Sequence, residues 1–185
     1  MLFIKYKPPN NLYLLKFKIY STFVIIFYFW LILKIRMEVI EMENQNLNIL
    51  DEVNKGATMG MEAIDIIKEK VTDNTFKEVL NTEYGKYEKI YDRINDLYAQ
   101  YSDKDPHEPG AMTKMMTWYG IQMRTITDDT TSKLSELLMQ GTNMGIIEGR
   151  RLLNHNEHAA PDVKNILNDF VVMQEDSVET LKKYL

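Results

Sequence analysis

The 185-residue sequence contains no cysteine. This absence excludes a disulfide framework, a thiolate nucleophile and a zinc site with cysteine ligands. It suits a reducing compartment, and we expect a cytoplasmic protein. Glycine and proline are also scarce, with eight and five residues, which favours helices over sheets. At this length we expect one domain with a real core, with or without an appendage.

Histidine is almost as scarce, which restricts acid–base and metal chemistry. The three histidines, His107, His155 and His158, all fall in stretches that we expect to be loops. Nothing in the sequence pairs one of them with a carboxylate and a nucleophile, so no catalytic triad is predicted. His155 and His158, with Glu157 between them, could bind a transition metal at the surface, but we favour a solvated loop.

Charge is distributed unevenly along the chain. Residues 1–36 carry six basic side chains and no acidic one. Removing these six from the 22 basic residues leaves 16 against 27 acidic ones, a net charge of −11 for residues 37–185. An acidic body argues against nucleic acid as a partner, because duplex binding depends on Lys and Arg neutralising phosphates.

Residues 1–41 form a hydrophobic, basic N-terminal segment, for which three interpretations compete. Residues 12–33 are mostly apolar, and the uncharged run from Ile19 to Leu33 approaches the length that a membrane-spanning helix needs if the stems of Lys16 and Lys18 snorkel. A membrane anchor is therefore one interpretation. A non-native extension, with translation starting at Met37 or Met42, is the second. A helix that docks on the rest of the protein is the third.

The body, residues 42–185, shows the apolar 3-4 spacing of packed helices. Asn48 is expected to cap a first helix whose buried positions are Leu50, Val53, Ala57, Gly60, Ile64, Ile67 and Val71. Asp73 is expected to cap a second, with Phe76, Leu80, Glu83, Tyr87, Ile90, Ile94, Leu97 and Tyr101 on its buried face. After a loop at 102–110, a short helix is expected at 111–127. Two more follow, from about 132 to 154 and from Pro161 to the end, with Val163, Leu167, Phe170, Gln174, Ser177, Leu181 and Tyr184 on the buried face of the last.

The chain also repeats itself. Gly56-Ala57-Thr58-Met59-Gly60 and Gly141-Thr142-Asn143-Met144-Gly145 share one pattern. The stretch 76–81 likewise aligns with 163–168, and this alignment runs to the end of the chain. We therefore expect one helical hairpin used twice, at 48–101 and 132–185. The glycines lie inside expected helices rather than at a strand-to-helix turn, so we interpret them as helix-packing positions and not as a phosphate loop.

A duplicated hairpin joined by a long middle connection is the arrangement of ferritin-like bundles. The predicted fold class is therefore all-α, an antiparallel four-helix bundle with a short crossover helix, and the body resembles the ferritin-like superfamily. More narrowly, MTKMMTWYGIQM, LLMQGTNMGIIEG and the terminal LKKYL resemble a small family from low-GC Gram-positive bacteria with which no activity is associated. This resemblance covers residues 47–185.

The ferritin-like resemblance implies a di-iron site with a Glu-x-x-His motif on two helices. No histidine follows a glutamate at that spacing, so we predict no catalytic residues, no metal ligands and no cofactor. We expect Glu83, Tyr87, Gln174 and Ser177 to form a buried polar layer instead. A histidine-free metal site of iron or manganese oxidase or storage type is the alternative, drawn from Glu62, Glu83, Glu88, Glu148 and Glu175.

The methionine-rich stretch of the crossover carries the partner prediction. Methionine fills core gaps and also serves adaptable binding surfaces. If this stretch is only half covered, it offers a docking patch for a second copy or another protein, made of Met112, Met115, Met116, Trp118 and Met123. We therefore predict a structural or protein-interaction module rather than an enzyme, with the metal-binding bundle and the membrane-anchored bundle as alternatives.

Overall fold

The computed structural model describes residues 10–102, 120, 122 and 127–185, and for residues 10–17 and 21 it describes only the backbone. These residues form four long helices, α1 (Asn10–Lys68), α2 (Asn74–Tyr101), α4 (Thr131–His155) and α5 (Pro161–Leu181), and a short 3-10 helix, η1 (Lys182–Tyr184). No strand occurs in this described part. The all-α prediction is therefore confirmed for the described residues. The expected helix at 111–127 lies outside them, apart from residues 120 and 122.

The chain divides into two compact units, Met1–Glu41 and Met42–Leu185. In the first unit, almost all of the large apolar side chains described between Ile19 and Ile40 are exposed. Over the part of the chain that the structure describes, no helix holds an apolar stretch long enough to cross a membrane. The membrane anchor predicted at residues 12–33 is not supported by the described residues, and the side chains of residues 12–17 and 21 lie outside them.

The start of the first helix was wrongly predicted. Asn48 caps nothing, because α1 is already helical from Asn10. Among the polar residues that precede Asn48 in α1, Asn46 is buried and only 1% exposed. Its side-chain oxygen accepts a hydrogen bond of 2.7 Å from the backbone N–H of Ala160. The Asn46 side chain therefore supplies a hydrogen-bond acceptor at the start of α5, where the N-cap residue Ala160 has no side chain that could accept a hydrogen bond.

The other helix starts follow local capping rules. The Asp73 carboxylate accepts hydrogen bonds from the backbone N–H groups of Thr75 (2.8 Å) and Phe76 (3.2 Å), so the predicted cap of α2 is confirmed. Thr130 caps α4, and the helix therefore starts at Thr131, one residue before the predicted start at about residue 132. Pro161 occupies the first turn of α5, where its missing N–H costs nothing.

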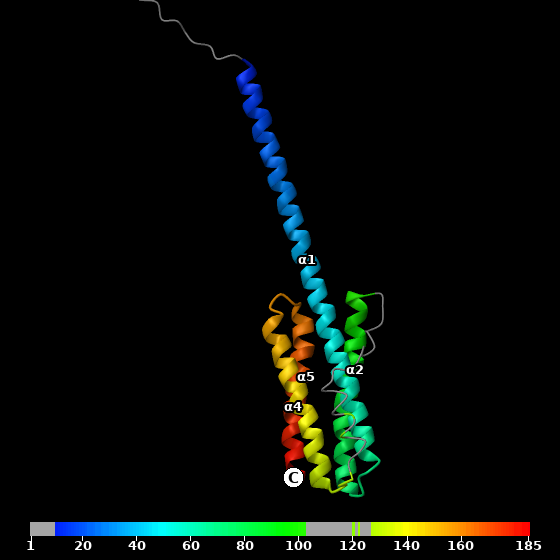
Figure 1. Cartoon of the computed structure of the whole chain (residues 1–185). Helices are drawn as coiled ribbons and strands as arrows, with labels where there is room; N and C mark the ends of the chain where they lie inside the picture. Colours follow the sequence, from blue (N-terminus) through cyan, green and yellow to red (C-terminus); the bar gives the residue numbers. More distant parts are fainter. Residues whose placement is uncertain (1–9, 103–119, 121, 123–126) are drawn as a thin grey trace, which may run out of the picture. The chain divides into compact units, whose positions relative to one another are not determined.

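The core of the second unit lies among α2, α4, α5 and the part of α1 that belongs to this unit (Figure 1). The positions predicted to be buried in the first helix are all buried except Gly60, which is half-buried, although Val71 lies beyond the end of α1. On α2 the predicted face holds as far as Ile94, after which Tyr98 replaces Leu97 and Tyr101 as the buried residue. Near the end of this 28-residue helix, the buried position is therefore shifted by one residue from the predicted one. Such drift is expected when a 3.6-residue turn is read with a 3.5-residue spacing.

Two polar contacts tie the second unit together across α5. The Arg93 guanidinium of α2 lies 2.8 Å from the Asp169 carboxylate. At the end of α5, the Leu181 carbonyl accepts a 2.7 Å hydrogen bond from the hydroxyl of Ser135, which is buried in the first turn of α4. The start of α4 therefore lies beside the end of α5.

Candidate functional site

A cavity of about 600 Å³ lies inside the second unit. Residues of α1, α2, α4 and α5 all line it. Its outer rim includes the exposed side chains Glu52, Ile147, Glu148 and Arg151. Its inner wall includes the buried polar residues Glu83, Tyr87, Thr142, Gln174 and Ser177. This volume falls in the range of small-molecule sites, about 300–1,000 Å³.

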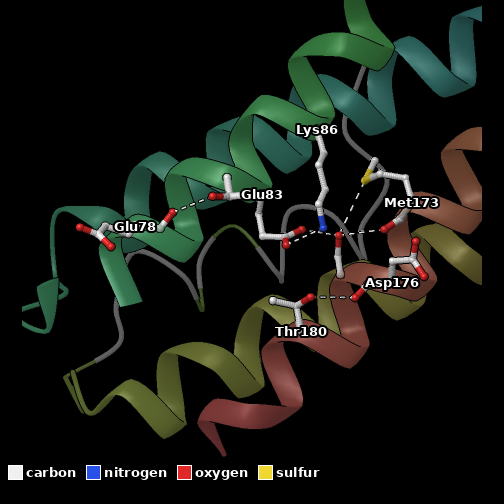
Figure 2. A network of polar contacts seen from close by, with 8 residues as sticks. Glu78, Glu83, Lys86, Met173, Asp176 and Thr180 are labelled. Carbon is white, nitrogen blue, oxygen red and sulfur yellow. Dashed lines mark hydrogen bonds and ion pairs between the residues drawn. The ribbon is translucent and has the colours of Figure 1, made fainter. Parts of the chain in front are cut away.

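Glu83 is the charged group of the inner wall and is only 3% exposed. One of its oxygens, Oε1, lies 2.7 Å from the Lys86 ammonium, one turn further along α2. The other, Oε2, accepts a hydrogen bond of 2.5 Å from the Ser177 hydroxyl of α5. Figure 2 shows the Lys86 side chain pointing toward the Glu83 carboxylate, on the side where Met173 of α5 lies. Both carboxylate oxygens therefore have partners, and the charge of Glu83 is balanced by Lys86.

Tyr87 lies one turn beyond Glu83 and is hydrogen-bonded to the side chains of Thr142 and Gln174. Burial raises the pKa of Tyr87 above its ordinary value, the two hydrogen bonds act in the opposite direction, and the nearby Glu83 carboxylate adds to the increase. The phenol is therefore neutral at physiological pH. Its ring packs edge-on against Phe170, with 6.3 Å between the ring centroids.

Gln174 is the residue of the inner wall that has a polar atom without a hydrogen-bond partner among the described residues. It is 3% exposed, and its Oε1 has no hydrogen-bond partner among the described residues. A buried amide oxygen without a partner costs free energy, about 1–3 kcal/mol. The predicted polar layer of Glu83, Tyr87, Gln174 and Ser177 is thus confirmed as buried, and it contains one free acceptor.

Glycines let the helices approach this wall closely. A Cβ atom on Gly60 would lie 2.6 Å from Cζ of Tyr87, and one on Gly56 would lie 2.8 Å from Cζ of Phe170. On α4, a Cβ atom on Gly145 would lie 2.7 Å from Oε1 of Gln174. The prediction that these glycines are packing positions is confirmed, since the neighbouring helix occupies the space that a side chain would need.

The carboxylates proposed for a histidine-free metal site do not gather around Glu83. Glu62 and Glu88 are exposed. Glu148 pairs with Arg151 on the same helix, and Glu175 pairs with Arg150 at 2.8 Å. Within the described ranges, no group of three His, Asp or Glu residues is placed to hold a metal ion.

Neither of the two described histidines lines the cavity. His155 is the last residue of α4 rather than a loop residue, and its ring nitrogen lies 2.8 Å from the Arg151 carbonyl. His158 is exposed in the following turn. His107 lies outside the described residues, as do Met112, Met115, Met116, Trp118 and Met123 of the predicted docking patch.

Sequence reasoning missed Thr142 of the inner wall and Lys86, the charged partner of Glu83. Thr142 belongs to the repeated glycine motif, but its burial was not foreseen. Lys86 follows Glu83 at the i, i+3 spacing of helical ion pairs, which was the available signal. Asn54 is a further buried residue without a sequence signal, and its Oδ1 has no partner among the described residues.

Comparisons with known proteins agree with the fold. No protein-family model matches the sequence, and a search of curated proteins gave no match, so the predicted family from low-GC Gram-positive bacteria is not supported. Among solved structures, the chain is similar to the bacterioferritin-related protein of Bacteroides fragilis, described as a dodecameric thioferritin. The TM-score is 0.60 at 9% identity, over 77% of this chain and 84% of that one. The chain therefore has a ferritin-like helical fold.

Proposed function

We propose that residues 42–185 form an antiparallel ferritin-like bundle of two repeated hairpins, 48–101 and 132–185, that lacks the di-iron centre of this fold and acts as a structural or protein-interaction module. The observation that carries the proposal is the state of Glu83. Both of its oxygens have partners within the chain, Lys86 and Ser177. A carboxylate so engaged would have to give up both contacts to ligate a metal ion.

The surrounding donor set does not fit a di-iron centre. Such a centre takes a glutamate from each of two helices and a glutamate–histidine pair from each of the other two. On the inner side of this cavity, near Glu83, α1 presents Gly56 and Gly60, α4 presents Thr142, and α5 presents Gln174 and Ser177. These groups are neutral and would leave the charge of two metal ions uncompensated. A polar layer of this kind fixes how helices register against each other.

Metal analysis of the full-length protein tests this proposal. We expect substoichiometric iron and manganese by inductively coupled plasma mass spectrometry after purification without chelators. We also expect no rise in the unfolding temperature when Fe²⁺ or Mn²⁺ is added, whereas a metal present at 100 times its Kd would stabilise the fold by about 2.7 kcal/mol. Near-stoichiometric metal that is lost in Glu83→Ala would instead establish the carboxylate-only metal bundle.

The partner surface remains part of the proposal. We place it on Met112, Met115, Met116, Trp118 and Met123, on the basis of their sequence spacing. Light scattering coupled to size-exclusion chromatography tests it directly. A dimeric mass for the wild type and a monomeric mass for a Met112→Gln/Met116→Gln variant would support self-association through this patch. A monomeric mass for both would remove the homodimer.

A further inference from the structure

We propose that residues 19–33 of the first unit, here called the apolar segment, bind the surface of a bilayer that contains anionic lipid and lie within one leaflet without crossing it. Basic residues bound this segment on both sides: Lys16 and Lys18 precede it, and Lys34 and Arg36 follow it. The inference goes beyond the structural or interaction role proposed for the second unit and does not depend on it. It rests on the exposure, the charge and the length of the apolar segment.

The apolar segment is exposed on every side. Residues 23–30 all have large aliphatic or aromatic side chains, and these are 38–68% exposed. The residues make just over two consecutive turns of α1, so their side chains point in all directions around the helix axis. A helix at the surface of a soluble protein keeps a polar face toward water. A helix that is apolar all round is stable instead where its surroundings are apolar on all sides.

The charges of the first unit match an anionic surface. Residues 1–36 contain six basic side chains and no acidic one. Lys18, Lys34 and Arg36 are exposed, and Lys34 lies 3.8 Å from the exposed Glu38. Each Lys or Arg held near an anionic leaflet strengthens binding about fivefold. The long aliphatic stems of these side chains let their charged ends reach the lipid headgroups while the apolar segment lies below them.

Aromatic residues of the apolar segment fit the same depth. The Trp30 ring lies 5.8 Å from the Lys34 ammonium, and its neighbour Tyr28 is exposed. Trp and Tyr concentrate at the boundary between headgroups and hydrocarbon, because their rings are apolar and each carries one polar group. The end of the segment that carries these rings therefore suits a position just below the headgroups.

A second copy of the chain fits the apolar segment less well. In a parallel pair, Lys34 and Arg36 would meet the same residues of the other copy. In an antiparallel pair centred on the segment, they would meet Lys16 and Lys18. Both arrangements place like charges together at each end. A partner helix would also cover only one side of the segment, whereas apolar side chains are exposed on all sides.

The length of the apolar segment favours an orientation along one leaflet. At 1.5 Å per residue the segment is about 22 Å long, whereas the hydrocarbon core of a bilayer is about 30 Å thick. In a spanning orientation, the basic side chains at one end would have to reach across several ångströms of hydrocarbon. In an orientation parallel to the surface, the basic side chains at both ends lie at the headgroups of the same leaflet.

Flotation of the full-length protein with vesicles tests the binding and its charge dependence. We expect binding to phosphatidylcholine vesicles that contain about 30% phosphatidylglycerol, and at least tenfold weaker binding to pure phosphatidylcholine. Lys34→Gln/Arg36→Gln should weaken binding to the anionic vesicles about tenfold or more. Lys182→Gln/Lys183→Gln removes the same charge from exposed positions of the second unit and should leave binding unchanged. No binding to anionic vesicles, or an equal loss in both double variants, would overturn the proposal.

A second pair of variants distinguishes insertion from adsorption by charge alone. Phe27→Glu places a carboxylate in the middle of the apolar segment and should abolish binding. Val172→Glu makes the same kind of change at an exposed apolar position of α5 and should leave binding unchanged. Circular dichroism establishes that each variant is folded. Undiminished binding by folded Phe27→Glu would overturn the proposal. So would a wild type that ignores vesicles and is dimeric by light scattering, with a monomeric Phe27→Glu, because a second copy would then cover the segment.

Fluorescence quenching measures the orientation of the apolar segment. Ile26→Trp, made together with Trp30→Phe and Trp118→Phe, leaves one indole near the middle of the segment. If the segment lies along one leaflet, lipids brominated close to the headgroups should quench this indole more strongly than lipids brominated close to the methyl ends of the acyl chains. Stronger quenching by the deeper bromines would mean that the helix crosses the bilayer and would overturn the proposed orientation.

Discussion

The glycines offer the sharpest test of the packing, because two of them occupy opposite environments. Gly60→Ala and Gly85→Ala make the same chemical change inside a helix. In both, alanine gains about 1 kcal/mol of helix propensity over glycine. The difference between them lies in the added methyl group. At Gly85, apart from the adjacent helix backbone, no heavy atom of the described residues lies within 4 Å of the new Cβ, whereas at Gly60 the Cβ would lie 2.6 Å from both Cδ1 and Cζ of Tyr87.

Tyr87 cannot move away cheaply. It is 4% exposed, packs against Phe170 and is hydrogen-bonded to Thr142 and Gln174. Overpacking of this kind costs about 1–3 kcal/mol. Gly60→Ala should therefore lose up to about 2 kcal/mol of stability after the propensity gain, while Gly85→Ala should gain up to about 1 kcal/mol. The two variants should be separated by roughly 1–3 kcal/mol, the cost of the overpacking alone.

Urea denaturation followed by far-ultraviolet circular dichroism measures this difference. The free energy of unfolding is obtained by linear extrapolation for the wild type and both variants in one buffer. Gly60→Ala should unfold at lower urea than the wild type, and Gly85→Ala at higher urea. If Gly60→Ala proves as stable as Gly85→Ala, then α1 does not approach the Tyr87 ring as closely as described. The description of the inner wall of the cavity would then also be wrong.

Three further predictions concern the polar contacts. Asn46→Ala should lower the free energy of unfolding by about 1–2 kcal/mol in urea denaturation, because the Ala160 N–H loses its acceptor, while Asn46→Asp keeps an acceptor and should lose less. Burial, with the hydrogen bond and charge of Asp162, raises the pKa of Tyr101 to about 12, so its contribution to stability is full below about pH 10 and is lost as the pH rises through 12. Denaturation at pH 9 to 12 should therefore show a steeper alkaline loss for the wild type than for Tyr101→Phe, and equal slopes would contradict the shift. Arg93→Ala removes an exposed ion pair and should cost less than about 1 kcal/mol at any salt concentration, as a larger loss would mean that the pair is more than a surface contact.

Much of the bundle was predictable because its signals are local. Asp73 and Pro161 mark helix starts through contacts within one turn. The apolar spacing of α1 and α2 predicted their buried faces, including Glu83 as the charged residue among apolar ones. The glycine pattern likewise predicted close helix packing. The start of α1 was wrongly predicted for the same reason, since Asn48 is by local rules a suitable N-cap residue, although α1 is already helical there.

The amino-acid sequence by itself determined the helical class, most helix starts and the faces that are buried, because capping and 3-4 spacing depend on neighbours within a few residues. Only the tertiary structure decided which partners those faces meet. Asn46 accepts a hydrogen bond from Ala160, which lies 114 residues away in the sequence. Ser177 donates one to Glu83, which lies 94 residues away. The free oxygen of Gln174 is likewise a property of what surrounds it. No local pattern records such contacts, because helix packing brings the residues together only after each helix has formed.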